Sequence, residues 1–324
     1  MLRLAALFGL LGLAAATGLI IWSGFDQVID ALSRAGWGIL WTSLYHIVSM
    51  VLCIIGWRAL MTDKKRPSHL FMLYVLWLRS SVNNLMPVAR IGGEFVAVRV
   101  MTKHGYDRDM SIASTIVELT MSVLAVFLFD ATGIGLFTHY VAPRDMGWQL
   151  LMGLLISIPA IAALVIVQRA GFFGLLSKIF SLMFRGSWTK FAGSAAALDE
   201  AVHAMYRKHG RVLICGFWQL LAWISGIGEI WLALHFLGHT TSLGKAFMLE
   251  ALIQASASAG FAVPGALGVQ EAGFLLFGHM LGLAPDIAAA MAVIRRCRDI
   301  ILFVPGLIVW QMQEGRWLLG KKRA

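Results

Sequence analysis

Long apolar segments alternate with short polar ones along the whole chain. A segment of about 18 or more apolar residues with few charges is typical of a helix that crosses a bilayer. By this measure we predict six spanning helices, at about 4–23, 37–61, 110–132, 147–167, 212–237 and 286–312. The pattern therefore predicts an all-α polytopic membrane protein, with residues 1–324 in a single transmembrane domain.

Two more apolar segments, at about 68–86 and 246–263, are each followed by an amphipathic piece, at about 88–100 and 268–283. A turn rich in proline and glycine joins each pair, "NNLMPVARIGG" in the first and "GFAVPGALG" in the second. Irregular backbone at membrane depth is tolerated where it faces protein or a water-filled cavity. We therefore predict two re-entrant hairpins whose turns line a cavity.

The two hairpin segments resemble copies of one element. Residues 81–117 align without a gap on residues 258–294, and Pro87 falls on Pro264, an offset of 177 residues. Because three predicted spans separate the hairpins, they enter the membrane from opposite sides. This pattern predicts inverted repeats, an arrangement of secondary transporters in which the site lies near the midplane. The two halves cover about 1–132 and about 147–312.

The distribution of charge supports this topology. Charged residues make up 14% of the chain, against about a quarter in soluble domains. With a cytoplasmic N-terminus, 18 of the 27 Lys and Arg residues lie in inside segments and three lie outside, so both termini are predicted to be cytoplasmic. The polar insertion at about 168–211 is predicted to form amphipathic helices on the inner membrane surface. The net charge of +10 forms no basic stripe with aromatic residues, so nucleic acid is not an expected partner.

Ionisable side chains also occur inside the apolar segments, where they are costly and typically face the interior of the bundle. We expect them to bind a lipid headgroup, with arginines on a phosphate group and glutamates balancing the charge. Asparagines before the first turn are added as possible hydrogen-bond donors. The candidate substrate-binding residues are Arg79, Asn83, Asn84, Arg90, Glu94, Glu118, Glu271, Arg295 and Arg296.

A structural interpretation of the same residues stays open. Glu118 aligns with Arg295 in the repeat and could form an ion pair with it, as Arg298 could with Asp299. The two asparagines could cap a half-helix. The glutamates that follow the two turns could cap the N-termini of broken helices, where the helix dipole favours negative charge.

Catalytic and cofactor motifs are absent from the sequence. It contains no phosphate-binding P-loop, no H-E-x-x-H motif and no G-x-S-x-G motif. The cysteines Cys53, Cys215 and Cys297 are isolated in apolar segments, so neither a disulfide nor a metal site is expected. We therefore name no catalytic residue, cofactor or metal, and the sequence favours a carrier over an enzyme.

Two motifs carry a resemblance to a known family. They are the N-x-x-P and G-G-E stretch at Asn84, Pro87, Gly92, Gly93 and Glu94, and the P-G-x-x-G-x-x-E stretch at Pro264, Gly265, Gly268 and Glu271. With them, nearly the whole chain resembles the flippase-like family that includes the transmembrane region of lysylphosphatidylglycerol synthases. Within this family it is most similar to a member associated with hopanoid biosynthesis. The resemblance implies a bacterial inner-membrane protein that moves, or helps to supply, a lipid.

Three hypotheses follow. The leading one is a flippase that moves a hopanoid, or an anionic or amino-modified phospholipid, through a polar cleft between the hairpins. The second is an integral membrane transferase that acts on lipid-linked intermediates. The third is a non-catalytic partner of hopanoid- or lipid-modifying enzymes. In each case the expected partner is a membrane lipid, a hopanoid or a phospholipid.

Overall fold

The computed structural model describes residues 25–61, 66–86, 92–169, 189–260, 263 and 266–321, and within these ranges all regular structure is helical. The helices are α2 (Phe25–Ala35), α3 (Gly38–Leu60), α4 (His69–Leu85), α5 (Gly92–Lys103), α6 (Arg108–Tyr140), α7 (Arg144–Arg169), α9 (Thr189–Arg207), α10 (His209–Phe236), α11 (Leu243–Ala259), α12 (Val269–Met280) and α13 (Pro285–Lys321). The predicted all-α fold class is confirmed.

Four helices are long and apolar enough to cross a membrane: Gly38–Leu60, Arg108–Tyr140, Asp145–Ala163 and His209–Phe236. They correspond to four of the six predicted spans. The predicted span at 4–23 lies outside the described residues. The predicted span at 286–312 lies within α13, where four ionisable residues between positions 295 and 299 interrupt the apolar sequence.

The two predicted hairpins, α4–α5 and α11–α12, begin in the same way. Ser68 precedes α4 and accepts a hydrogen bond from the backbone N–H of Phe71 at 3.2 Å. Ser242 precedes α11 and accepts one from the N–H of Lys245 at 3.3 Å. A serine cap satisfies one of the N–H groups that the first turn of a helix leaves unpaired. The turns themselves, with Pro87 and Pro264, lie outside the described residues.

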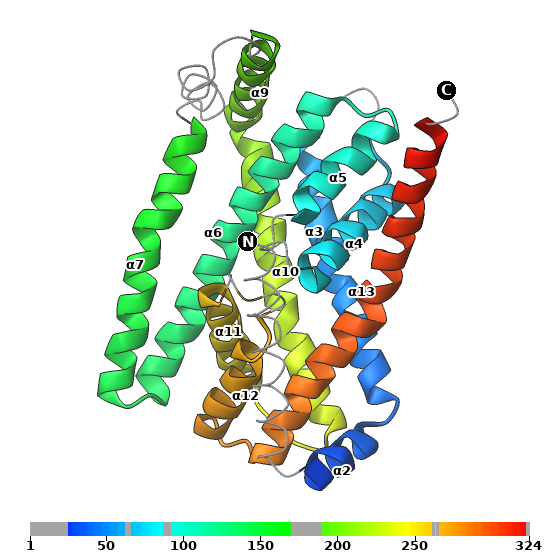
Figure 1. The fold of residues 1–324 in the computed structure, drawn as a ribbon. Coiled ribbons are helices and arrows are strands. Elements are labelled where there is room, and N and C mark those ends of the chain that lie inside the picture. Colours follow the sequence, from blue (N-terminus) through cyan, green and yellow to red (C-terminus); the bar gives the residue numbers. More distant parts are fainter. Residues whose placement is uncertain are drawn as a thin grey trace.

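The helices pack around a central pair, α3 and α10, and the contacts on one side of this pair match those on the other. Helix α4 packs on α13, as α11 packs on α6. Helix α5 packs on α6, as α12 packs on α13. Figure 1 shows α4 and α5 in the half of the bundle near the C-terminal end of α13, and α11 and α12 in the opposite half.

The central pair depends on glycine. A Cβ at Gly228 of α10 would overlap the Tyr45 hydroxyl of α3, and one at Gly56 of α3 would lie 2.9 Å from the Trp218 Cβ of α10. Close helix approach through small residues is common in membrane proteins, where packing replaces the hydrophobic effect as the driving force. Two buried apolar clusters flank this pair. One is built mainly from α10 to α13, and the other mainly from α3 to α6 and α9.

Candidate functional site

Buried ionised side chains gather in two clusters, one on each hairpin. The first cluster is centred on Arg79 of α4. Its Nε lies 2.9 Å from the Glu94 carboxylate of α5, and its Nη1 lies 2.5 Å from Glu118 Oε2 of α6. The guanidinium also lies over the Trp57 ring, 5.2 Å from the ring centroid. One cation therefore joins three helices and two carboxylates.

The start of α5 explains how Glu94 is positioned. Asn83 Oδ1 accepts a hydrogen bond from the Gly93 N–H at 2.7 Å, and Asn83 Nδ2 donates to Glu94 Oε1 at 3.3 Å. A Cβ at Gly93 would overlap the carbonyl oxygen of Arg79, so only glycine allows this approach. Asn83 thus serves the capping role of the structural interpretation. Asn84 donates to the Ser80 carbonyl of its own helix at 2.9 Å.

The second cluster is centred on the arginines of α13. Arg295 pairs with Glu250 of α11. Arg298 Nη1 lies 2.8 Å from Glu229 Oε1 of α10. The predicted contact of Arg298 with Asp299 is confirmed at 2.6 Å. Glu229 is shared further, since Arg295 lies 3.5 Å from its Oε1 and His46 Nδ1 of α3 lies 2.9 Å from its Oε2.

Glu271, the counterpart of Glu94, has two roles in this cluster. Its Oε2 accepts a hydrogen bond from the Gly268 N–H at 2.7 Å, which caps α12 where Gly268 turns the chain with φ of +80°. Its Oε1 lies 2.6 Å from Arg296 Nε. Glu271 therefore fits both the capping interpretation and a place in a charged site.

The structure differs from the expected pairing. Glu118 contacts Arg79, and Arg295 contacts Glu250, so the pair of Glu118 with Arg295 is wrong. The repeat equates the positions of these two residues in the chain, whereas ion pairing depends on which helices pack together. Arg90, another candidate, lies outside the described residues.

Charge balance also differs from the expectation that the arginines bind a phosphate group. Across the described parts of the two clusters, the arginines are Arg79, Arg295, Arg296 and Arg298, and the carboxylates are Glu94, Glu118, Glu229, Glu250, Glu271 and Asp299. Carboxylates outnumber guanidinium groups, so these arginines are occupied by acidic partners. The arrangement is better suited to a group that carries positive charge than to a phosphate alone.

Several contributors were missing from the list of candidates, among them Gln219, Glu229, Glu250 and Asp130. Gln219 Nε2 of α10 donates to Glu118 Oε1 at 2.8 Å. Glu250 of α11 is buried. Asp130 of α6 is buried beside a cavity, and its signal was a carboxylate inside an apolar span. Gln219 carries no charge and therefore had no comparable signal in the sequence.

The described His, Cys, Asp and Glu side chains include no group of three placed to hold a metal ion. The contacts that the structure shows at the two clusters are ion pairs and hydrogen bonds. Such a site can bind a polar headgroup or move a proton, and we assign it no bond-breaking step.

Comparison with known proteins identifies the family of this chain. The family described as the lysylphosphatidylglycerol synthase TM region matches residues 9–306. The chain belongs to this family. A UPF0104 membrane protein of Methanothermobacter thermautotrophicus is 25% identical over 310 residues, covering 90% of each chain. A UPF0104 membrane protein of Pyrococcus horikoshii is 21% identical over 317 residues, again covering 90% of each chain. No solved structure matches.

Membership in this family makes the chain a membrane protein associated with lipid. The two relatives are also described as membrane proteins. The names of these relatives state no substrate and no activity.

Proposed function

We propose that this protein is a flippase, which moves a lipid headgroup between leaflets while the acyl chains stay in the bilayer. The observation that carries the proposal is the pair of buried ionised clusters, one on each hairpin, in a bundle whose contacts repeat around α3 and α10. Buried charges in a membrane bundle are expensive and typically mark a transport path. The family supports a role that involves lipid.

The matching contacts favour inverted repeats. Helices α3 to α6 exchange places with α10 to α13, so that α4 on α13 corresponds to α11 on α6. In such folds, broken helices from the two halves form the site, and rocking of one half against the other exposes it to each side in turn. The proposed halves are those of the sequence, about 1–132 and 147–312. A bacterial inner membrane and cytoplasmic termini stay predictions.

The excess of carboxylates narrows the substrate class. Among a hopanoid, an anionic phospholipid and an amino-modified phospholipid, the last provides a cation that can replace one arginine on a carboxylate. Glu94 is suited to this exchange because its Oε2 is buried and its close contact among the described residues is the ion pair with Arg79 Nε, at 2.9 Å. A protonated amine would donate to that oxygen and strengthen its charge balance.

The test uses the full chain reconstituted into liposomes with a fluorescent amino-modified phospholipid. Glu94→Gln combined with Glu271→Gln removes both charges. Glutamine at position 271 still completes the capping box of α12, and Asn83 still caps α5. We expect the rate of lipid movement to fall at least tenfold. Glu200→Gln changes an exposed glutamate of α9 and serves as the matched control. An unchanged rate in the double variant would contradict the proposal. A chemically altered lipid in extracts would favour the transferase instead.

A further inference from the structure

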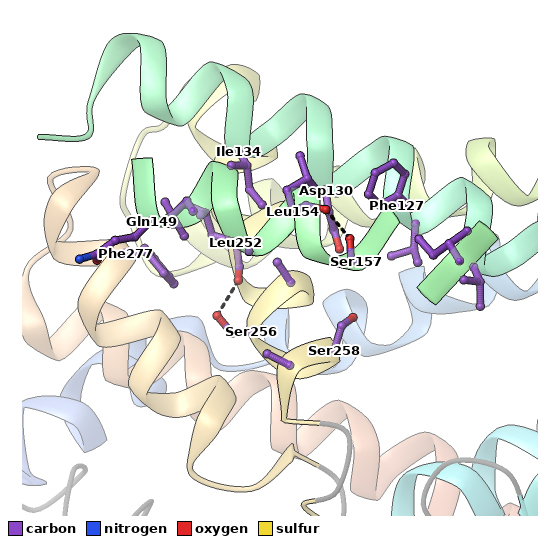
Figure 2. A pocket seen from close by; sticks show the side chains of 17 residues that line it. Phe127, Asp130, Ile134, Gln149, Leu154, Ser157, Leu252, Ser256, Ser258 and Phe277 are labelled. Carbon is purple, nitrogen blue, oxygen red and sulfur yellow. Dashed lines mark hydrogen bonds between the residues drawn. The ribbon is translucent and has the colours of Figure 1, made fainter. Parts of the chain in front are cut away.

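A cavity of about 650 Å³ lies between α6, α7 and α11, beside the second cluster. Figure 2 shows its lining, which is mainly apolar and includes Phe127, Leu154, Leu252 and Phe277. Helix α7 packs on α6, and Figure 1 shows it on the outer side of the bundle. The cavity is thus walled by the hairpin helix α11 on one side and by a peripheral helix on the other.

One ionisable side chain, Asp130 of α6, lines this cavity. It is 6% exposed, and its Oδ1 has no hydrogen-bond partner among the described residues. Two hydroxyl groups of the lining are engaged elsewhere. Ser157 donates to the Leu154 carbonyl at 2.6 Å, and Ser256 donates to the Leu252 carbonyl at 2.7 Å. The lining residues include no Lys, Arg or His, so the cavity offers Asp130 no cation, and its Oδ1 has no donor among the described residues.

The groups that face Asp130 from neighbouring helices do not compensate its charge. From α11, Glu250 acts on it electrostatically, and Glu250 is itself occupied by Arg295. Helix α7 contributes the neutral Gln149 and Ser157, and α12 contributes Phe277. An ionised carboxylate without a partner costs several kcal/mol in an apolar surrounding, whereas a neutral carboxyl group costs far less.

We propose that Asp130 is a proton-binding site and that the cavity is its route to water. A proton from cavity water binds Oδ1 and forms a neutral carboxyl group, and the reverse step returns the proton to water. The site would make lipid movement proton-linked, a consequence that rests on the proposed function. The step transfers only a proton and involves no oxidation or reduction.

Packing explains how the proton would act on the rest of the bundle. Helices α6 and α11 touch where Gly133 lies against Ala251, a contact that leaves no room for a Cβ at Gly133. Glu250, the neighbour of Ala251 in the chain, pairs with Arg295 of α13. A negative charge at Asp130 repels Glu250, whereas the neutral form leaves the pair of Glu250 with Arg295 undisturbed. Protonation therefore biases how α6, α11 and α13 fit together.

The first experiment measures the proton itself. Infrared spectra of the full-length protein in lipid membranes report the C=O stretch of protonated carboxyl groups, which shifts in D₂O. We expect this band in the wild type at neutral pH and its loss in Asp130→Asn. Asp145→Asn, which changes an exposed aspartate of α7, should keep it. Absence of the band in the wild type, or its survival in Asp130→Asn, would overturn the site.

The second experiment measures coupling. Liposomes containing the protein receive a pH gradient of either direction, and the movement of a labelled amino-modified phospholipid is followed. The gradient should change the rate in the wild type and in the Asp145→Asn control, and have no effect in Asp130→Asn. Asp130→Glu, which restores a carboxyl group, should recover part of the dependence. If the rate of lipid movement by the wild type did not depend on the pH gradient, the proposed coupling would be wrong. A wild type that moves no lipid at all overturns the proposed function and leaves the infrared result standing.

Discussion

The two hairpins hold their buried carboxylates in different ways. On the first hairpin, Arg79 is the one arginine among the described residues that faces the two glutamates from α5 and α6. On the second, three arginines of α13 share four carboxylates, and Glu229 is contacted by Arg295, Arg298 and His46. In the described part of the first cluster, the charge of both glutamates is therefore balanced by one arginine. In the second cluster, Glu229 keeps other cationic contacts when one arginine is lost.

The helix contacts that correspond across the bundle differ too. Between α4 and α13, the Tyr74 hydroxyl donates to Gln313 at 2.9 Å and the Trp77 indole donates to the Leu302 carbonyl at 2.6 Å. Between α6 and α11, the contact is apolar, with the Phe129 and Phe247 rings 4.9 Å apart, and it borders the cavity. Hydrogen bonds in an apolar surrounding are costly to break. We therefore expect α6 and α11 to separate more easily than α4 and α13.

The largest expected effect comes from removing the single arginine of the first cluster. Arg79→Met leaves Glu94 and Glu118 without their cation, and breaking a buried ion pair in this way costs about 3–5 kcal/mol. Unfolding of the purified protein in mixed detergent micelles measures the loss. Arg34→Met, at an exposed arginine of α2, is the control. A loss no greater than that of the control would mean that Arg79 is not the centre of this cluster.

A smaller effect is expected from the equivalent change in the second cluster. Arg295→Met removes the partner of Glu250, but Glu229 keeps Arg298 and His46. One carboxylate left unsatisfied costs about 1–3 kcal/mol. The same unfolding measurement compares the two variants directly. If Arg295→Met destabilised the protein as much as Arg79→Met, the difference between the clusters would not hold.

The smallest effect is expected at the end of the α4–α5 hairpin, where the bundle reaches the surface. Arg99 of α5 contacts both carboxylate oxygens of Glu314 on α13, at 2.8 and 2.5 Å, but its side chain is 45% exposed. Glu314→Gln should cost less than about 1 kcal/mol, because water solvates exposed ion pairs. The loss should shrink further at high salt. A loss above that of Arg295→Met would show that this surface pair holds α5 on α13.

The sequence predicted the helices better than the contacts between them. Spans such as 212–237 follow from the length of an apolar segment, which is a local property, and α10 matches this one. The pairing of Glu118 depends on α4 and α6 meeting in space, and the repeat alignment carries no such information. The sequence did indicate that Arg298 would contact Asp299, because the two are neighbours in the chain.

The missed residues have physical reasons of their own. Gln219 is neutral, so a pattern of charged residues in apolar segments does not predict its hydrogen bond to Glu118. Asp130 was passed over because a lone carboxylate barely changes the hydropathy of a long span, and its importance comes from the cavity that α7 and α11 form around it. Cavities arise from packing, and single-sequence periodicity does not report them.

Helix α6 connects the first cluster with the cavity. Glu118, which completes the first cluster, and Asp130, which lines the cavity, are both on α6, and twelve residues of α helix separate them by about 18 Å. Helix α6 is a rigid element that carries one carboxylate at each of these two sites. Any tilt that lets one carboxylate change partners also displaces the other, so the two compartments of the bundle cannot be rearranged independently.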